Sequence, residues 1–191
     1  MEDTRRGVLG LLGSGATIAL AGCLAPGSDR SVTNVESTAL SVRSRRPRWR
    51  DGDDVGFLAV LDDPKRAEIA RSQFALSAER AETVEAFIAA TDFETERLLL
   101  VESVGPSACY REIEFSSIHL DGETLRGTAA AVARNGDACA MVITYPAVLL
   151  RVTFAGPPVD RAALRIRNGW DRDALVVGST TTDLSEFAPV N

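Results

Sequence analysis

The sequence contains a single histidine, His119, and a single lysine, Lys65, among its 191 residues. Blue-copper sites use two histidines and a cysteine, and catalytic zinc sites commonly use two or three histidines. One histidine cannot supply either site, so its scarcity excludes the common imidazole-based metal centres. The scarcity of lysine means that nearly every positive charge is carried by an arginine.

Positive charge as a whole is also in short supply, because 27 acidic residues outnumber 21 basic ones and give a net charge of -6. Non-specific binding to nucleic acid needs a cationic surface, so nucleic acid is not predicted as a partner. Apolar residues make up 45% of the chain and charged residues 25%, the balance of an ordinary soluble domain. This composition excludes a multi-span membrane protein and a disordered chain.

The first 23 residues have the three-part layout of a secretory signal. Arg5 and Arg6 precede a mildly apolar stretch over residues 7–22, and a Leu-Ala-Gly-Cys sequence ends at Cys23. The paired arginines resemble a twin-arginine export signal, and the final four residues resemble a lipobox, whose cysteine carries a lipid. We therefore predict a twin-arginine lipoprotein signal peptide over residues 1–22 and a lipid on Cys23, which holds the protein at the extracellular face of the cell membrane. A signal peptide with an accidental cysteine is the alternative.

Two cysteines remain beyond Cys23, both in the segment predicted to be exported. Cys109 and Cys139 form an even pair, and exported chains meet oxidising conditions. A Cys109–Cys139 disulfide is therefore predicted, and it would close a loop of about 30 residues worth roughly 3–4 kcal/mol in the chain-entropy model. Two buried free thiols are the alternative.

The chain after the signal divides into three parts by composition. Residues 23–34 contain proline, glycine and serine without periodicity, and they are predicted to form a lipid-anchored tether. Residues 35–178 are predicted to form a single β-rich domain. Residues 179–191 are rich in threonine and are predicted to form a loose C-terminal tail.

Period-two and continuous apolar patterns within the domain predict at least seven strands. They are expected over residues 35–42, 55–61, 97–104, 110–120, 124–132, 138–154, 163–167 and 170–177. Pro146 is expected to break the run over 138–154 or to mark an edge strand, because proline cannot donate a ladder hydrogen bond. One helix is expected over residues 77–90, with Ser77 as its N-cap. Because helical crossovers are missing, we predict a mainly β (β-rich α+β) fold, an antiparallel sandwich or open barrel with one helix.

Ser117 and His119 are the candidates for nucleophilic catalysis. They lie two residues apart and share a face of a regular strand, with Asp121 close behind. A hydrolase needs its histidine to reach the serine oxygen beside an oxyanion hole, whereas neighbours on one strand point outward in parallel. An exported hydrolase using Ser117 and His119 is therefore the alternative function, and an exposed histidine before a turn is the favoured interpretation.

A soft metal site built from Cys109, His119, Cys139 and Met141 supports a second alternative, a surface carrier of a metal or small ligand. A disulfide would use both sulfur atoms and so competes with this site. Paired acids elsewhere suit weak calcium binding or, more simply, a solvated acidic surface. The sequence therefore predicts no metal site and no cofactor.

Five arginines lie within residues 43–50, about 20 residues after Cys23. Each gains about 1 kcal/mol beside an anionic lipid surface, which favours a membrane contact. Three aspartates follow within residues 51–54 and favour the other interpretation, a solvated loop whose charges are neutralised.

Three aromatic residues with a polar group, Tyr110, Tyr145 and Trp170, form the candidate binding surface. Such amphipathic rings are enriched at recognition surfaces. They also fill cores, so a buried position is the alternative for each of them.

Residues 90–154 contain short motifs in a distinctive order. These are Thr91 to Glu96, Gly105 to Tyr110, Gly136 to Cys139 and Thr144 to Pro146, with apolar strands after the first and the last. The order resembles the protease-complex-stabilising domain family named PrcB, which occurs in lipoproteins and secreted proteins. Where that family has a Thr-Gly-Gly-Tyr turn, this chain has Ser-Ala-Cys-Tyr, ending at Tyr110. The chain as a whole resembles lipoproteins of halophilic archaea, through its twin-arginine lipobox, acidic balance and near absence of lysine.

The resemblance implies a non-catalytic β domain held at the cell surface that assists another exported protein. No catalytic residue is carried over from the family. We therefore expect a lipid-anchored accessory or binding protein that stabilises another exported protein and is not an enzyme. Its expected partners are the membrane, through the lipid on Cys23, and that exported protein.

Overall fold

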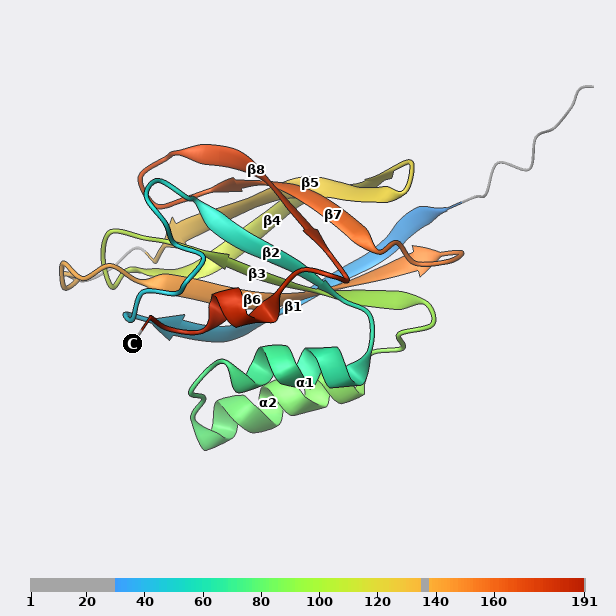
Figure 1. The fold of residues 1–191 in the computed structure, drawn as a ribbon, viewed down its shortest axis with the longest axis horizontal. Helices are drawn as coiled ribbons and strands as arrows, with labels where there is room; N and C mark the ends of the chain where they lie inside the picture. The colour runs from blue at the N-terminus through green and yellow to red at the C-terminus, as the bar shows by residue number, and fades with distance from the viewer. Residues whose placement is uncertain (1–29, 135–137, 191) are drawn as a thin grey trace, which may run out of the picture.

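Two four-stranded β-sheets packed face to face form the body of the protein, and two helices lie against one of them (Figure 1). The structure is a computed structural model and describes residues 30–134 and 138–190. In spatial order, sheet I contains β1 (Ser31–Arg43), β6 (Tyr145–Ala155), β3 (Glu96–Ser103) and β2 (Gly56–Leu61). Sheet II contains β4 (Tyr110–Asp121), β5 (Thr124–Ala133), β7 (Arg161–Arg167) and β8 (Asp173–Ser179). The predicted mainly β fold is confirmed, and the two separate sheets make it a sandwich.

The strands pair mostly antiparallel, as predicted, while β5 and β7 pair in parallel. β4 and β5 form the predicted hairpin, whose turn contains Gly122 with a φ of 60. β7 and β8 form the hairpin predicted around Asn168, but its loop runs from 168 to 172. The Asn168 side chain organises this loop by accepting hydrogen bonds from the backbone N–H groups of Trp170 and Arg172.

The central strands of sheet I are buried on both faces, and this explains their continuous apolar sequence. On one face, Leu99 of β3 packs in a cluster with Leu164 of β7, between the two sheets. On the other face, Leu100 of β3 packs in a second cluster with Val84, beneath the helices. In the described part of the chain, neither helix covers sheet II, and its strand β7 alternates buried and exposed residues over 164–167.

Two helices, α1 (Pro64–Ser72) and α2 (Ala78–Ala89), cover sheet I. α2 is the predicted helix, and its N-cap Ser77 accepts a hydrogen bond from the backbone N–H of Arg80 at 3.4 Å. α1 is a correction to the expectation of a single helix. Its N-cap Asp63 accepts from the backbone N–H of Arg66 at 2.8 Å, and Pro64 begins its first turn. Asp63-Pro64 therefore begins a helix as well as ending the preceding strand region.

Pro146 lies inside sheet I, which contradicts the expectation of an edge strand. It is the second residue of β6, and β6 lies between β1 and β3. The proline is tolerated because it lies near the start of the strand. Residues 138–143 are not a strand, and Met141 is 87% exposed. The expected run over 138–154 therefore forms one strand, β6, and not two.

The C-terminal segment is packed against the domain, so the expectation of a loose tail is wrong. A short 3-10 helix spans Leu184–Phe187, and both of these residues are buried. Phe187 packs edge-on against Phe57 at 4.3 Å between ring centroids. At the other end of the domain, β1 begins at Ser31, so residues 31–34 of the predicted tether belong to a strand.

Candidate functional site

The two long sides of the sandwich are built differently. On one side, Gly178 of β8 lies so close to β2 that an added Cβ atom would meet the carbonyl oxygen of Leu58 at 2.3 Å. On the other side, β1 and β4 are neighbouring edge strands that belong to separate sheets. We call the surface between them the β1–β4 seam and define it by residues 35–42 of β1 and 111–118 of β4.

Two grooves follow one another along the β1–β4 seam. The first has a volume of about 590 Å³ and is lined by residues 35–37, residues 113–118 and Leu150. The second has a volume of about 390 Å³. Its lining combines residues 39–42 and 111–112 with Ala75, Leu76, Ser77, Arg80 and Arg134. The grooves make the seam an elongated surface.

The edge of β1 that faces the seam presents backbone groups to a ligand. The carbonyl oxygen of Ala39 accepts a hydrogen bond from Arg80 at 3.2 Å, so it points away from β6. Pairing of β1 with β6 is regular from 34 to 39, and alternate residues of a strand direct their N–H and C=O groups to the same edge. The backbone groups of Val35 and Ser37 therefore point toward the seam as well.

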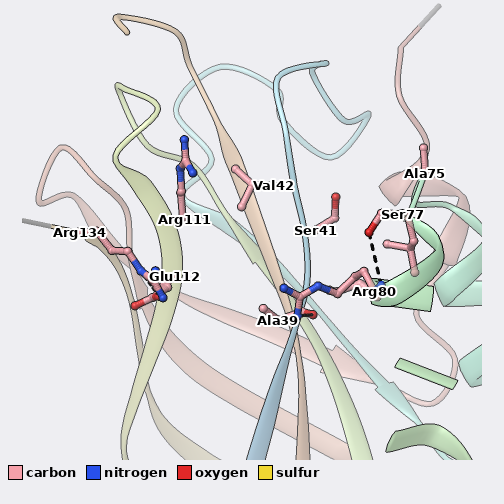
Figure 2. A pocket seen from close by; sticks show the side chains of 11 residues that line it. Ala39, Ser41, Val42, Ala75, Ser77, Arg80, Arg111, Glu112 and Arg134 are labelled. Carbon is pink, nitrogen blue, oxygen red and sulfur yellow. Dashed lines mark hydrogen bonds and ion pairs between the residues drawn. The ribbon is translucent and has the colours of Figure 1, made fainter. Parts of the chain in front are cut away.

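Three arginines from different elements line the second groove (Figure 2). Arg80 lies in α2, Arg111 in β4, and Arg134 directly after β5. Arg134 forms an ion pair with Glu112, and Arg111 donates from Nε to the carbonyl oxygen of Ala108 at 2.7 Å. Within residues 30–134 and 138–190, neither Arg80 nor Arg111 has an acidic partner. This end of the seam is therefore positively charged, in a chain whose net charge is -6.

A buried charged cluster fixes the end of β1 next to this groove. Glu102 is fully buried and accepts hydrogen bonds from Arg43 Nε at 2.7 Å, Arg43 Nη2 at 2.6 Å and Trp49 Nε1 at 2.5 Å. Arg43 is the last residue of β1, and its guanidinium lies 4.8 Å from the ring centroid of Phe74. Burial raises the pKa of Glu102 to about 7, against the hydrogen bonds from Arg43 and Trp49 that lower it.

Neither Glu102 nor the three arginines of the second groove were predicted as site residues from the sequence. Glu102 carried a detectable signal, because it is an acid inside a predicted strand whose sequence is otherwise strongly apolar. The three arginines gave no such signal in the sequence, because residues 80, 111 and 134 are far apart in the chain and only the fold brings them together.

The three aromatic candidates do not form a single exposed surface. Tyr145 is buried and packs edge-on against Trp49 at 6.1 Å, so it is a core residue. Tyr110 is half-buried, and its ring lies where a side chain on Gly169 would have to go. Trp170 is 43% exposed in the β7–β8 loop. The proposed role of Tyr145 in a binding surface is therefore wrong, while Trp170 does lie at the surface.

Ser117 and His119 lie on β4 at an irregularity between Ser116 and His119, where Ser117 has a φ of 55. The Nδ1 atom of His119 lies 2.7 Å from the backbone carbonyl oxygen of Ser117, which makes Nδ1–H the donor. In the part of the chain that the structure describes, no hydrogen bond joins the imidazole to the Ser117 hydroxyl. This geometry does not activate the serine as a nucleophile.

Cys109 and Cys139 form a disulfide, with their Cα atoms 5.5 Å apart, so the predicted pairing is confirmed. The bond joins the segment before β4 to the segment before β6, and both sulfur atoms of the candidate soft metal site are used in it. Among residues 30–134 and 138–190, no three histidine, cysteine, aspartate or glutamate side chains gather in a way that could hold a metal ion.

The arginines between residues 43 and 50 are largely engaged within the domain. Arg43 binds Glu102, Arg46 lies 3.7 Å from Asp51, and Arg50 donates to the carbonyl oxygen of Asp54. These contacts engage three of the five arginines, and Arg46 is the one paired with an aspartate of residues 51–54 among the described residues.

The export and lipidation residues Arg5, Arg6 and Cys23 lie outside the described residues. No helix in the described part of the chain has the length and apolar character needed to cross a bilayer. No protein-family model matches the chain, and no curated protein or solved structure matches it either. The site therefore has to be interpreted from its own geometry.

Proposed function

We propose that this chain is a lipid-anchored protein at the extracellular face of the cell membrane, which binds another exported protein and does not catalyse a reaction. The observation that carries the proposal is the β1–β4 seam, where an open strand edge, two grooves and two arginines with no acidic partner among the described residues lie together. Free strand edges are pairing sites for other chains, and proteins normally cover or blunt them. The seam has the features of a surface used for recognition.

The predicted lipid would place this surface close to the membrane. Cys23 and Ser31, the first residue of β1, are eight residues apart. At roughly 3.3–3.6 Å per residue, this segment reaches at most about 29 Å. The domain would therefore be held near the bilayer, where it meets other exported proteins.

Binding is supported over the two alternatives by specific contacts. A hydrolase would need a hydrogen bond between the His119 imidazole and the Ser117 hydroxyl. Nδ1 of His119 instead donates to the Ser117 backbone carbonyl oxygen. A soft metal carrier would need the sulfur atoms of Cys109 and Cys139, which are joined in a disulfide. Binding of a ligand at the seam requires neither a new hydrogen bond at His119 nor reduction of the disulfide.

The anchor is tested by fractionation of cells that express Cys23→Ser or the Arg5→Lys, Arg6→Lys double variant. We expect Cys23→Ser to lose membrane association and the double lysine variant to fail to reach the surface. Intact mass of the native protein should show a lipid on Cys23. An unmodified Met1 terminus or a cytosolic pool of native protein would contradict the proposed localisation.

The binding role is tested by photo-crosslinking in membranes. A photoreactive amino acid replaces Val35 in the seam or, as a matched control, Leu175 on the exposed face of β8. Both side chains are exposed, so either replacement should leave the fold intact. We expect one recurrent exported protein to crosslink to position 35 and not to position 175. Equal crosslinking at the two positions would contradict the role of the seam.

A further inference from the structure

The free edge of β1 sets the shape of a ligand that it can bind through backbone hydrogen bonds. Val35, Ser37 and Ala39 direct their backbone groups into the seam at every second residue, and Arg80 already occupies the Ala39 carbonyl. A partner that matches this spacing is an extended chain, because successive strand residues rise about 3.4 Å. Peptides that add as a strand to a sheet edge bind in this way.

The grooves suit the side chains of such a peptide. The regular part of this edge, residues 35–39, spans about 14 Å of strand, a length that an extended peptide can follow. Phe115 and Ile118 are partly buried along the first groove, and Val35 is partly exposed opposite them. These apolar side chains offer contacts to alternate residues of an added strand.

Charge distinguishes the two ends of the seam. Arg80 and Arg111 have no acidic partner within the described residues, and guanidinium groups bind carboxylates in a bidentate geometry. Glu114 lines the other groove, where it disfavours a second acidic group, while Glu36 at that groove is paired with Arg151. A peptide with carboxylates at one end is therefore held in one direction.

We propose that the β1–β4 seam binds an extended peptide segment of an exported partner by adding it as a strand to the free edge of β1, with its carboxylates at the groove formed by Arg80, Arg111 and Arg134. This inference rests on the proposed function of the chain as a binding protein and names the chemistry of its ligand.

The probe is a fluorescein-labelled twelve-residue peptide of alternating valine and threonine with two glutamates at one end. Fluorescence polarisation measures its binding to the full chain, made with Cys23→Ser so that no lipid is attached. We expect saturable binding that weakens at high salt. Replacing both glutamates with lysines, or N-methylating alternate amides, should each weaken binding at least about ten-fold, because the first removes the carboxylates and the second removes the edge hydrogen bonds.

Arginine variants locate the carboxylate end. Arg80→Ala and Arg111→Ala should each weaken binding about five-fold, the loss expected for one exposed charge-assisted contact. Arg167→Ala is the matched control, because Arg167 is an exposed arginine on β7. It should change the affinity less than two-fold, and the melting temperatures of all three variants should match that of the parent chain.

Three outcomes would overturn the inference: equal binding of the lysine peptide, insensitivity to N-methylation, or an Arg167→Ala effect as large as that of Arg111→Ala. Self-association of the chain that Arg111→Ala abolishes would replace the peptide with a second copy as occupant. If the partner crosslinks to position 35 and the glutamate peptide does not bind, this inference fails while the proposed function stands. If position 35 captures no exported protein, the proposed function itself fails.

Discussion

The two long sides of this sandwich show what leaves a strand edge open to a ligand. At the β2–β8 side, Gly178 allows the two backbones to approach until no side chain fits between them. At the β1–β4 side, grooves of about 590 and 390 Å³ follow the line between the two edges. One side is closed by contact, and the other presents backbone groups and charge to a ligand. The same architecture thus protects one pair of edges and exposes the other.

The open side depends on support from within sheet I. Arg43 ends β1 and is held by Glu102, which is fully buried beneath the cover of sheet I. The Cys109–Cys139 disulfide lies beside Arg111 and holds the start of β4 to the segment that leads into β6. These contacts keep the two edges in place without joining them.

The largest loss of stability is expected from Glu102→Ala, which removes the acid that holds Arg43 at the end of β1. The substitution leaves the Arg43 guanidinium buried without its acid, and breaking a buried pair in this way costs about 3–5 kcal/mol of unfolding free energy. Glu102→Gln keeps a hydrogen-bond acceptor and should cost less. Chemical denaturation of both variants checks the order, and equal stability of Glu102→Ala and the parent chain would contradict it.

The closed side is tested by Gly178→Ala. The new methyl group would lie 2.3 Å from the Leu58 carbonyl oxygen, so the backbones must separate at a cost of about 3 kcal/mol. Ser37→Val is the matched change on the open side, where the exposed side chain should alter stability by at most about 0.5 kcal/mol. Thermal unfolding of the two variants measures the difference, which would vanish if both sides were equally open.

Removal of the disulfide should have an effect of similar size, concentrated at the open side. Its loop has a sequence separation of 30, for which the chain-entropy model gives roughly 3–4 kcal/mol. The Cys109→Ser, Cys139→Ser double variant should lose that stability and also bind the glutamate peptide more weakly, because Arg111 is less firmly placed. Stability equal to that of the oxidised parent would contradict this role.

The last of the four effects, similar in size to that of the disulfide, is a pH dependence that comes from Glu102. Burial raises its folded pKa above the ordinary value of 4.5 to about 7, so the folded state binds more protons than the unfolded state between these values. The contribution is therefore present below about pH 4.5 and is lost as the pH rises through 7, by roughly 3 kcal/mol. The stability difference between the parent chain and Glu102→Gln should fall from pH 5 to pH 8, and a rise would contradict the assignment.

Much of the fold was predictable because its signals are local. The Leu98 to Val101 run, the Ser77 cap and the Asn168-Gly169 turn each predicted an element that the structure contains. α1 was missed because only Ala67 and Ala70 of its nine residues are buried, which leaves little apolar periodicity to detect. The tail was misjudged for a similar reason, since two buried residues anchor a threonine-rich segment.

The candidate site was largely beyond reach of the sequence. Residues 35–42 and 111–118 are separated by about 70 positions, and no local pattern reports that two strand edges will face each other unpaired. The amphipathic ring of Tyr145 favoured a place in a binding surface, but the fold buries this ring against Trp49. The disulfide was predictable because an even number of cysteines in a segment predicted to be exported favours it without reference to geometry.

Amide hydrogen exchange of the full chain, with and without the glutamate peptide, tests most directly whether the β1 edge is the binding site. Without peptide, we predict rapid exchange at Val35 and Ser37 and slow exchange at Glu36 and Thr38, whose amides face β6. With peptide, exchange at Val35 and Ser37 should slow while exchange along β8 stays unchanged. Slow exchange at all four amides before the peptide is added, or protection confined to β8, would contradict the account.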